Sequence, residues 1–295
     1  MKIDPRHLIM NLLLGAAGQR LAAREAVASC ALFGIRENSV RVALARLSAA
    51  GRIQAVGRGE YRLGPSAERL AADVAGWRDA EGRVCDWNGS WIAVHVGSLG
   101  RSDRAALRVR DRALGLLGLR QLDRGLFLRP DNLDGGVAAA RDRLTKLGLE
   151  PGAAVFGASG FDASRERRAA ALWDGPALTR AYRETRARLQ AWLAGADSLA
   201  LDTAARESFL LGNDAIRQLV FDPLLPAPLV DVEARRAFVD TVLSFDAAGH
   251  AIWNRFLRDG VPRRANARAH RASYHVHRSR HASRPDPVAT QETPS

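Results

Sequence analysis

The chain has 295 residues, enough for about two domains at roughly 100–200 residues each. Its two cysteines have neither metal-ligand nor disulfide spacing, and no apolar run approaches the ~18 residues of a membrane span. The N-terminus lacks the charged, apolar and small-residue regions of a signal peptide. We therefore expect a cytoplasmic protein with no membrane partner. The formal charge is +12, and 42 of the 44 basic residues are arginine, which a GC-rich genome and a polyanionic partner explain equally well.

The first 66 residues predict three helices followed by a β-hairpin. The first helix begins after Asp4, the second ends near Phe33, and the third runs from about Glu37 to Ala50. Residues 53–56 and 60–63 flank a Gly-Arg-Gly tip and form the hairpin. Three helices and a ribbon are the plan of a winged helix-turn-helix, which lays its third helix in the DNA major groove.

The third helix has two chemically different faces. Its apolar residues at helical spacing should be buried; they are Val40, Ala43, Leu44 and Leu47. Its other side is small, polar and cationic: asparagine can bind adenine, arginine can grip guanine through two bonds, and serine or arginine can hold phosphate. An ordinary surface helix with solvated arginines is the alternative, and the ribbon that follows favours DNA binding. The predicted DNA-contacting residues are Arg36, Asn38, Ser39, Arg41, Val42, Arg46 and, at the hairpin tip, Arg58.

A linker helix is expected at residues 67–86, followed by a middle domain at residues 87–164. This domain alternates β-branched or apolar strands with helices; the strands are expected at 91–96, 119–129 and 153–157, and the helices at about 103–117 and 134–147. The β-α-β-α-β order favours a small ferredoxin-like α+β sandwich.

Residues 165–259 predict a helical C-terminal domain, with breaks at 174–176, 195–198 and 222–228. Residues 260–295 hold seven arginines, four histidines and four prolines with little apolar content, which predicts a disordered basic tail. The fold class is therefore mixed α+β and mostly helical, with an N-terminal winged helix-turn-helix, a ferredoxin-like middle domain and a helical C-terminal domain.

The positive charge gathers at the two ends of the chain. Residues 1–65 carry a net charge of +6 and residues 260–295 a net charge of +5, so the residues between them are almost neutral. A basic head and a basic tail are the pattern expected of a protein that binds a polyanion. For the tail alone, an inert solubilising role explains the charge equally well.

Five short motifs occur along residues 8–258 in one order. They are Phe33-Gly34-Ile35 with Val40-Arg41 and Leu44 to Leu47, Trp87-Asn88-Gly89-Ser90-Trp91, Gly125-Leu126-Phe127-Leu128-Arg129-Pro130-Asp131-Asn132, Leu172-Trp173-Asp174 with Tyr182, and Phe221-Asp222-Pro223-Leu224-Leu225-Pro226. Each is weak alone, but together the chain resembles the PaaX-like family of phenylacetic acid degradation regulators. The resemblance implies a homodimeric transcriptional repressor that binds a double-stranded DNA operator and responds to an aryl-CoA or acyl-CoA effector.

A protein that binds an effector of this kind needs hydrogen-bond donors for its phosphates and an aromatic side chain on which a ring of the effector can stack. The arginine-rich helix near residues 101–112 is suited to the phosphates, because arginine binds phosphate through two bonds, and two tryptophans are suited to stacking on a ring. A solvated helix face and core-packing tryptophans are the more frequent roles of such residues. The candidate ligand-binding residues are Trp87, Trp91, Arg101, Arg104 and Arg108.

Catalysis finds little support in the sequence. His275 and His277 have metal-ligand spacing but no carboxylate nearby, and the strand at 91–96 holds His95 and no acid, unlike the first strand of a metal-dependent nuclease of similar fold. We therefore expect a protein that is not an enzyme and has neither cofactor nor metal. Two alternatives stay open: an acyl-CoA-binding protein or enzyme that uses its head for assembly, and an RNA-binding accessory protein, which the scarcity of aromatic residues in the basic regions disfavours.

Overall fold

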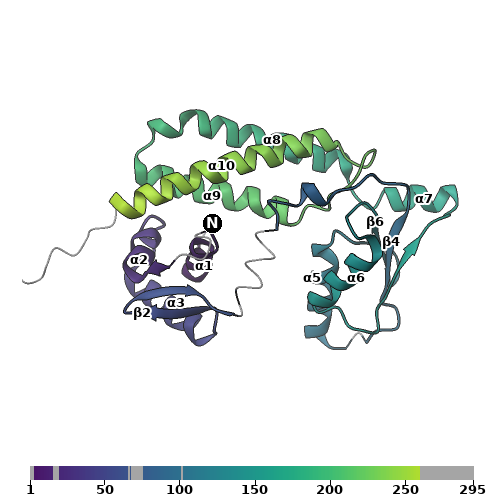
Figure 1. The fold of residues 1–295 in the computed structure, drawn as a ribbon, viewed down its shortest axis with the longest axis horizontal. Helices are drawn as coiled ribbons and strands as arrows, with labels where there is room; N and C mark the ends of the chain where they lie inside the picture. The colour runs from purple at the N-terminus through teal and green to yellow at the C-terminus, as the bar shows by residue number, and fades with distance from the viewer. Residues whose placement is uncertain (1–2, 16–19, 66, 68–75, 101, 260–295) are drawn as a thin grey trace, which may run out of the picture. The chain divides into compact units, whose positions relative to one another are not determined.

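A computed structural model describes residues 3–15, 20–65, 67, 76–100 and 102–259 (Figure 1). Over these residues the chain is mixed α+β and mostly helical, with two antiparallel sheets. None of the described helices is both long enough and apolar enough to span a bilayer. The expected tail at residues 260–295 lies outside the described part of the chain.

The N-terminal part combines three helices with a three-stranded sheet of order β1-β3-β2. The helices are α1 (Pro5–Gly15), α2 (Ala23–Ala31) and α3 (Glu37–Ala49). The strands are β1 (Leu21–Ala22), β2 (Ile53–Gly57) and β3 (Glu60–Leu63). The expected helices and hairpin are therefore present, and the apolar face of α3 is buried as predicted.

Strand β1 was not expected, because its residues were assigned to the second helix. Leu21 pairs instead with Tyr61 of β3. Helix α2 begins only at Ala23, where the Glu25 carboxylate accepts the backbone N–H of Ala22 at 2.8 Å and closes the first turn. The next residue along, Ala23, donates its own N–H to the Gly59 carbonyl at 2.7 Å, so the hairpin tip is tied to the start of α2.

The middle part has the order β-α-β-β-α-β, with one strand more than the sequence predicted. Its elements are β4 (Trp91–His95), α5 (Arg104–Leu116), β5 (Arg120–Asp123), β6 (Leu126–Pro130), α6 (Gly136–Lys146) and β7 (Ala154–Ala158). The expected strand at 119–129 is two strands, because Gly125 adopts a φ of +77° and reverses the chain. A Cβ at Gly125 would lie 2.8 Å from the Gly97 Cα, so only glycine fits this turn.

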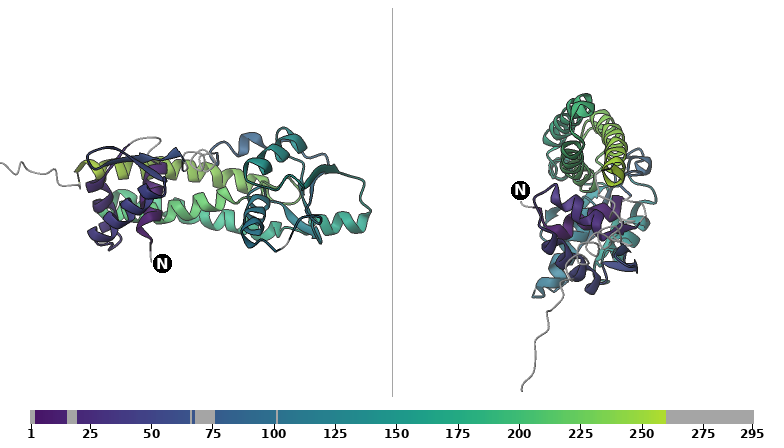
Figure 2. Two further views of the ribbon diagram at one scale, coloured as in Figure 1. Left: turned by 90° about the horizontal axis from the view of Figure 1, so that it is seen from below. Right: turned by 90° about the vertical axis from the view of Figure 1, so that its left-hand side faces the viewer.

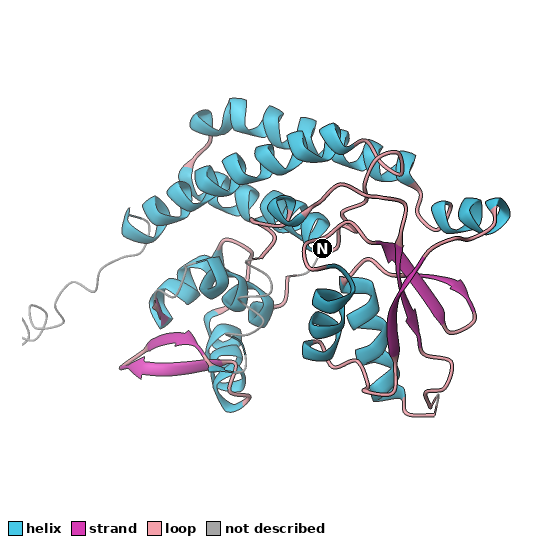
Figure 3. Ribbon diagram, turned by 45° about the vertical axis from the view of Figure 1, so that its right-hand side comes forward, coloured by secondary structure: helices cyan, strands magenta, loops and turns pink. Residues whose placement is uncertain are grey.

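All four strands of this sheet pair antiparallel in the order β5-β6-β4-β7. Residues Trp91 to Val94 of the central strand β4 are buried on both faces. Ile92 and Val94 pack with Leu114 of α5 and Leu144 of α6, which cover one face (Figure 3). Trp91 and Ala93 belong to a second cluster on the other face, which includes residues of the C-terminal helices.

Of the linker helix expected at residues 67–86, residues 68–75 lie outside the described part of the chain. Where residues 77–86 are described, they form a turn and the short 3-10 helix η1 (Glu81–Arg83) instead of an α-helix. The expectation of a helix to residue 86 is therefore wrong at its C-terminal end.

The C-terminal part is helical, with breaks close to the predicted ones. Its helices are α7 (Ala163–Ala170), α8 (Gly175–Gly195), the 3-10 helix η2 (Ala196–Ser198), α9 (Leu201–Val220) and α10 (Val232–Asp259). Asp162 and Asp174 cap α7 and α8 by accepting backbone N–H groups of the first turn. Helix α10 runs along both α8 and α9 (Figures 1 and 2), and Phe238, Val242 and Phe245 on α10 are buried there.

Candidate nucleic-acid interface

The outward face of α3 presents its predicted DNA-contacting residues to solvent. Arg36 occupies the N-cap position, and Asn38, Ser39, Arg41, Val42 and Arg46 are all exposed on the helix. Val42 keeps half of its surface accessible, so an aliphatic side chain lies among the polar ones on this face. A protruding helix with small and polar side chains outward has the shape that entry into a major groove requires.

The start of α1 lies beside this face. Asp4, Pro5 and Arg6 line a shallow depression together with Asn38, Ser39, Val42, Ala43 and Arg46 of α3. Arg6 is bound to Asp4, with 2.9 Å between Nη2 and Oδ2, and this contact lowers the pKa of the Asp4 carboxyl. This neighbourhood could not be predicted from the sequence, in which Asp4 indicates only the start of a helix.

The arginines of the α3 face differ in their partners. Arg41 is held by Glu37 one turn earlier, with 2.9 Å between Nε and Oε1, in an exposed ion pair. Among the described residues, Arg36 and Arg46 have no carboxylate partner. Arg46 is therefore free to meet a base edge or a phosphate, whereas Arg41 must first leave Glu37.

The hairpin tip adds a further exposed cation. Arg58 lies between Gly57 and Gly59, and Gly59 has a φ of +76° that a side chain would strain. Its neighbour Glu60 is paired with Arg20 at 3.2 Å, which leaves Arg58 without an ion-pair partner in the described part of the chain. The predicted position of Arg58 at an exposed turn is thus what the structure has.

The two tryptophans proposed for ligand stacking lie in packed surroundings. Trp91 is fully buried, stacks on Trp173 with 6.1 Å between ring centroids, and donates its indole N–H to Glu166 at 3.1 Å. Trp87 packs edge-on against Trp91 and donates to the Ser90 carbonyl at 2.6 Å. Trp91 offers no exposed ring face, so the stacking role expected of it is corrected to core packing.

The arginines of α5 divide into two kinds. Arg104 and Arg108 are exposed, and Arg101 lies outside the described residues. Arg110 points inward instead: it is almost fully buried, contacts the Glu150 carboxylate and donates to the Gly100 carbonyl at 3.1 Å. This contact with Arg110 lowers the pKa of Glu150 and raises that of Arg110. The sequence did not separate the buried arginine from its exposed neighbours.

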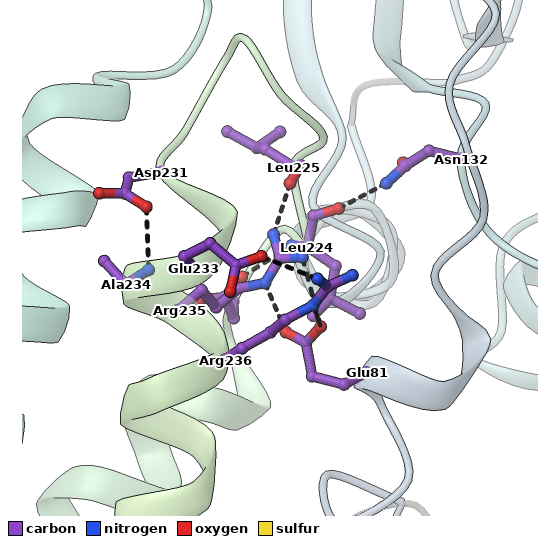
Figure 4. Close-up of polar contacts among 10 residues, drawn as sticks. Glu81, Asn132, Leu224, Leu225, Asp231, Glu233, Ala234, Arg235 and Arg236 are labelled. Atoms are coloured by element: carbon purple, nitrogen blue, oxygen red, sulfur yellow. Dashed lines mark hydrogen bonds and ion pairs between the residues drawn. The ribbon is translucent and has the colours of Figure 1, made fainter.

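A buried polar junction joins segments that are far apart in the sequence (Figure 4). Arg235 of α10 is fully buried, and its guanidinium contacts the Glu81 carboxylate of η1 and the Leu225 carbonyl. Nearby, Asn132 donates to the Leu224 carbonyl at 2.7 Å and accepts from the buried Arg129 at 3.1 Å. Three segments therefore meet at this junction: η1, the residues that follow β6, and the turn between α9 and α10.

Burial dominates the electrostatics around this junction. It raises the pKa of Asp222, whose Oδ1 accepts the Leu224 N–H at 2.7 Å, and also that of the Tyr182 hydroxyl. It lowers the pKa of Arg129 to about 10. Tyr182 and Arg129 are buried and Asp222 is partly buried, so the junction reads as a structural joint. Three of the five sequence motifs supply residues to it: Arg129 and Asn132 from the Gly125 to Asn132 stretch, Tyr182, and the segment Phe221 to Pro226.

No group of histidine, cysteine, aspartate or glutamate side chains in the described ranges is arranged to hold a metal ion. His275 and His277, considered for that role, lie outside those ranges.

The comparisons agree with this architecture at both ends of the chain. The family described as PaaX-like protein matches residues 4–67, and the PaaX-like protein C-terminal domain matches residues 173–255. No curated protein matches the chain. Among solved structures, the uncharacterized protein Rv0674 from Mycobacterium tuberculosis is similar at 27% identity and a TM-score of 0.54, over 84% of this chain and 98% of that one. With matches to both its N-terminal and its C-terminal part in the expected order, the chain belongs to the PaaX-like family.

Proposed function

We propose that the chain is a homodimeric, DNA-binding transcriptional repressor of an aromatic or acyl-CoA catabolic operon, acts in the cytoplasm and is released from DNA by an aryl-CoA-type ligand. PaaX-like proteins are generally transcriptional regulators of phenylacetic acid catabolism. The observation that carries the proposal is the outward face of α3, which is polar and cationic on a helix whose other face is packed.

The arrangement of the head supports a winged helix-turn-helix. Three helices precede a hairpin whose strand β3 is flanked by β1 and β2, and the hairpin tip carries an exposed arginine. In such a module the third helix enters the major groove and the wing touches the backbone. In such a complex we expect Asn38 and Arg46 to contact adenine and guanine edges, and Arg58 to contact a phosphate.

The middle part supports a ferredoxin-like sandwich. The chain order β-α-β-β-α-β, the antiparallel order β5-β6-β4-β7 and two helices on one face are the features of that fold. In the proposed dimer two heads occupy half-sites separated by about one helical turn, ~10 bp, or a multiple of it.

Release follows from linkage between two binding sites. A ligand that binds more tightly to a dimer with wrongly spaced heads shifts the population away from DNA. A coupling free energy of about 1–3 kcal/mol would weaken DNA binding roughly 5- to 150-fold.

Gel-shift titrations at several salt concentrations test the proposal, on a duplex that the full chain selects from a random-sequence pool. Arg46→Ala should cost about 1–3 kcal/mol of binding free energy if Arg46 reads a base. Arg58→Ala should weaken binding on all sequences and lower the salt slope by about one. Arg188→Ala is the matched control, since Arg188 is exposed on α8.

Three results would remove the proposal. One is failure to select any duplex, and another is unchanged affinity in both head variants. The third is turnover of an acyl-CoA by the purified chain, which would support an enzyme instead.

A further inference from the structure

Three exposed arginines form a stripe along α5 that winds slightly around the helix. Arg104, Arg108 and Arg112 recur at four-residue intervals, and all three are exposed. At 1.5 Å per residue the stripe extends over about 12 Å of helix. In the described part of the chain none of the three has a carboxylate or carbonyl partner.

This stripe lowers the stability of the helix that carries it. Like charges four residues apart destabilise a helix by about 0.2–0.5 kcal/mol per pair, and the stripe has two such pairs. Asp111, exposed three positions after Arg108, offsets one pair of this size at most. Arg104 is also the first residue of α5, where the helix dipole disfavours a cation. Elsewhere the chain places glutamate beside arginine at such spacings, as in Glu37–Arg41 on α3. A bound polyanion would relieve the repulsion in α5.

The shape of the stripe favours an extended polyanion over a single phosphate group. Side chains at four-residue intervals on one helix spread along a line and do not converge on a point. The large exposed apolar side chain on α5 is Val109, and no aromatic side chain lies on that helix. Because binding of single strands relies on aromatic stacking, the stripe suits the backbone of a duplex better than a single strand.

We propose that Arg104, Arg108 and Arg112 form a second DNA-binding surface, which holds backbone phosphates outside the half-site read by α3. The proposal rests on the proposed function, because it requires the chain to bind duplex DNA. Binding at this surface is independent of sequence, since phosphates carry no base information. Each phosphate contact should add about 0.9 to the salt slope on duplex DNA.

The test compares two duplexes with the full chain. One ends at the selected site, and the other extends that site by about three helical turns, roughly 30 bp, on each side. The variant R104Q/R108Q/R112Q removes the stripe, and R180Q/R188Q/R206Q removes the same charge from exposed positions on α8 and α9. Melting curves of both variants confirm that they are folded.

The unmodified chain should bind the long duplex more tightly than the short one. The α5 variant should lose that advantage, and its salt slope on the long duplex should fall by up to about 5.4 for the proposed dimer, six contacts (three per protomer) at about 0.9 each. On the short duplex it should bind like the unmodified chain. The control variant should keep the advantage.

Equal binding of the two duplexes by the unmodified chain would overturn the inference and leave the proposed function intact. Equal loss of the long-duplex advantage in the α5 variant and the control variant would have the same meaning. Binding of neither duplex would overturn both. Calorimetry with coenzyme A gives the remaining outcome: if the α5 variant loses affinity for coenzyme A and keeps the long-duplex advantage, the stripe holds ligand phosphates and the inference is wrong.

Discussion

The outward face of α3 and the buried junction around Arg235 both depend on arginine, but in opposite ways. On α3 the guanidinium groups are exposed, and Arg46 has no ion-pair partner in the described residues. At the junction Arg235 is fully buried between the Glu81 carboxylate and the Leu225 carbonyl. Composition alone could not separate the two roles, because nearly every basic residue of the chain is arginine. Burial is what separates them.

The difference has an energetic consequence. An exposed ion pair contributes about 0–1 kcal/mol to stability, whereas breaking a buried pair by removing one partner costs about 3–5 kcal/mol. Substitutions at the junction should therefore act on folding, and substitutions on the α3 face should act on DNA affinity with little change in folding.

The largest effect is expected for Glu81→Gln. This change leaves the Arg235 charge buried without its carboxylate, so the free energy of unfolding should fall by about 3–5 kcal/mol. Urea denaturation followed by circular dichroism measures it. Arg236→Gln is the control, since Arg236 is exposed and forms only a long contact, 3.9 Å from Nε to Oε2, with the same Glu81 carboxylate. A loss below about 1 kcal/mol in the Glu81 variant would mean that the junction is not a buried ion pair.

Asn132→Ala should have the next largest effect. It leaves two buried polar groups without these partners, the Leu224 carbonyl and Nη2 of Arg129, while Nε and Nη1 of Arg129 keep the Pro130 and Leu117 carbonyls. Each such group costs about 1–3 kcal/mol, so destabilisation should lie in that range or somewhat above it. The exposed Asn254 on α10 provides the control, Asn254→Ala. Equal unfolding midpoints for the two variants would contradict the assigned hydrogen bonds.

The Arg110–Glu150 pair predicts an acid-sensitive contribution to stability. Arg110 lowers the pKa of Glu150 below its ordinary value of 4.5 in the folded chain. Because the folded carboxyl holds its proton less tightly than the unfolded one, its contribution is complete above that value and is lost as the pH falls through the lowered pKa. The stability difference between the unmodified chain and Glu150→Gln should therefore shrink as the pH drops below 4.5. A difference that stays constant with pH would exclude this linkage.

The smallest effect is expected on the exposed side of the comparison, for Glu37→Gln. It frees Arg41 from an exposed pair and removes a negative charge near the proposed DNA surface. The free energy of unfolding should change by only about 0.3–0.5 kcal/mol, while the affinity for duplex DNA at low salt should rise. Arg41→Ala in the same gel-shift series should weaken binding. Weaker binding by the Glu37 variant would show that this pair helps to present α3 to DNA.

The spacing of apolar residues and glycines in the sequence predicted the N-terminal part of the chain, residues 1–66, well. The spacing of Val40, Leu44 and Leu47 gave both the helix and its buried face, and the glycines around Arg58 gave the hairpin. Strand β1 was missed because two residues carry no periodicity of their own and pair only through β3. The division into β5 and β6 was missed because the turn at Gly125 interrupts an otherwise apolar run.

Long-range contacts could not be predicted in the same way. Glu81 and Arg235 are separated by 154 positions, and nothing in either local sequence marks it as buried. The same holds for Arg110, which lies two positions from the exposed Arg108 and Arg112 but faces the opposite side of α5. Trp91 was considered for ligand stacking because tryptophan is suited to both surfaces and cores, and only the structure shows its contacts with Trp173.

The bond between the Gly59 carbonyl and the Ala23 N–H has a consequence for the free energy of the proposed DNA binding. It fixes the backbone of the hairpin tip against helix α2, so only the side chain of Arg58 has to become ordered when it meets a phosphate. Each immobilised long side chain costs about 0.5–1.5 kcal/mol on association, and ordering a loose loop would add to this. In the proposed complex, a hairpin held in this way would need little backbone ordering on binding duplex DNA.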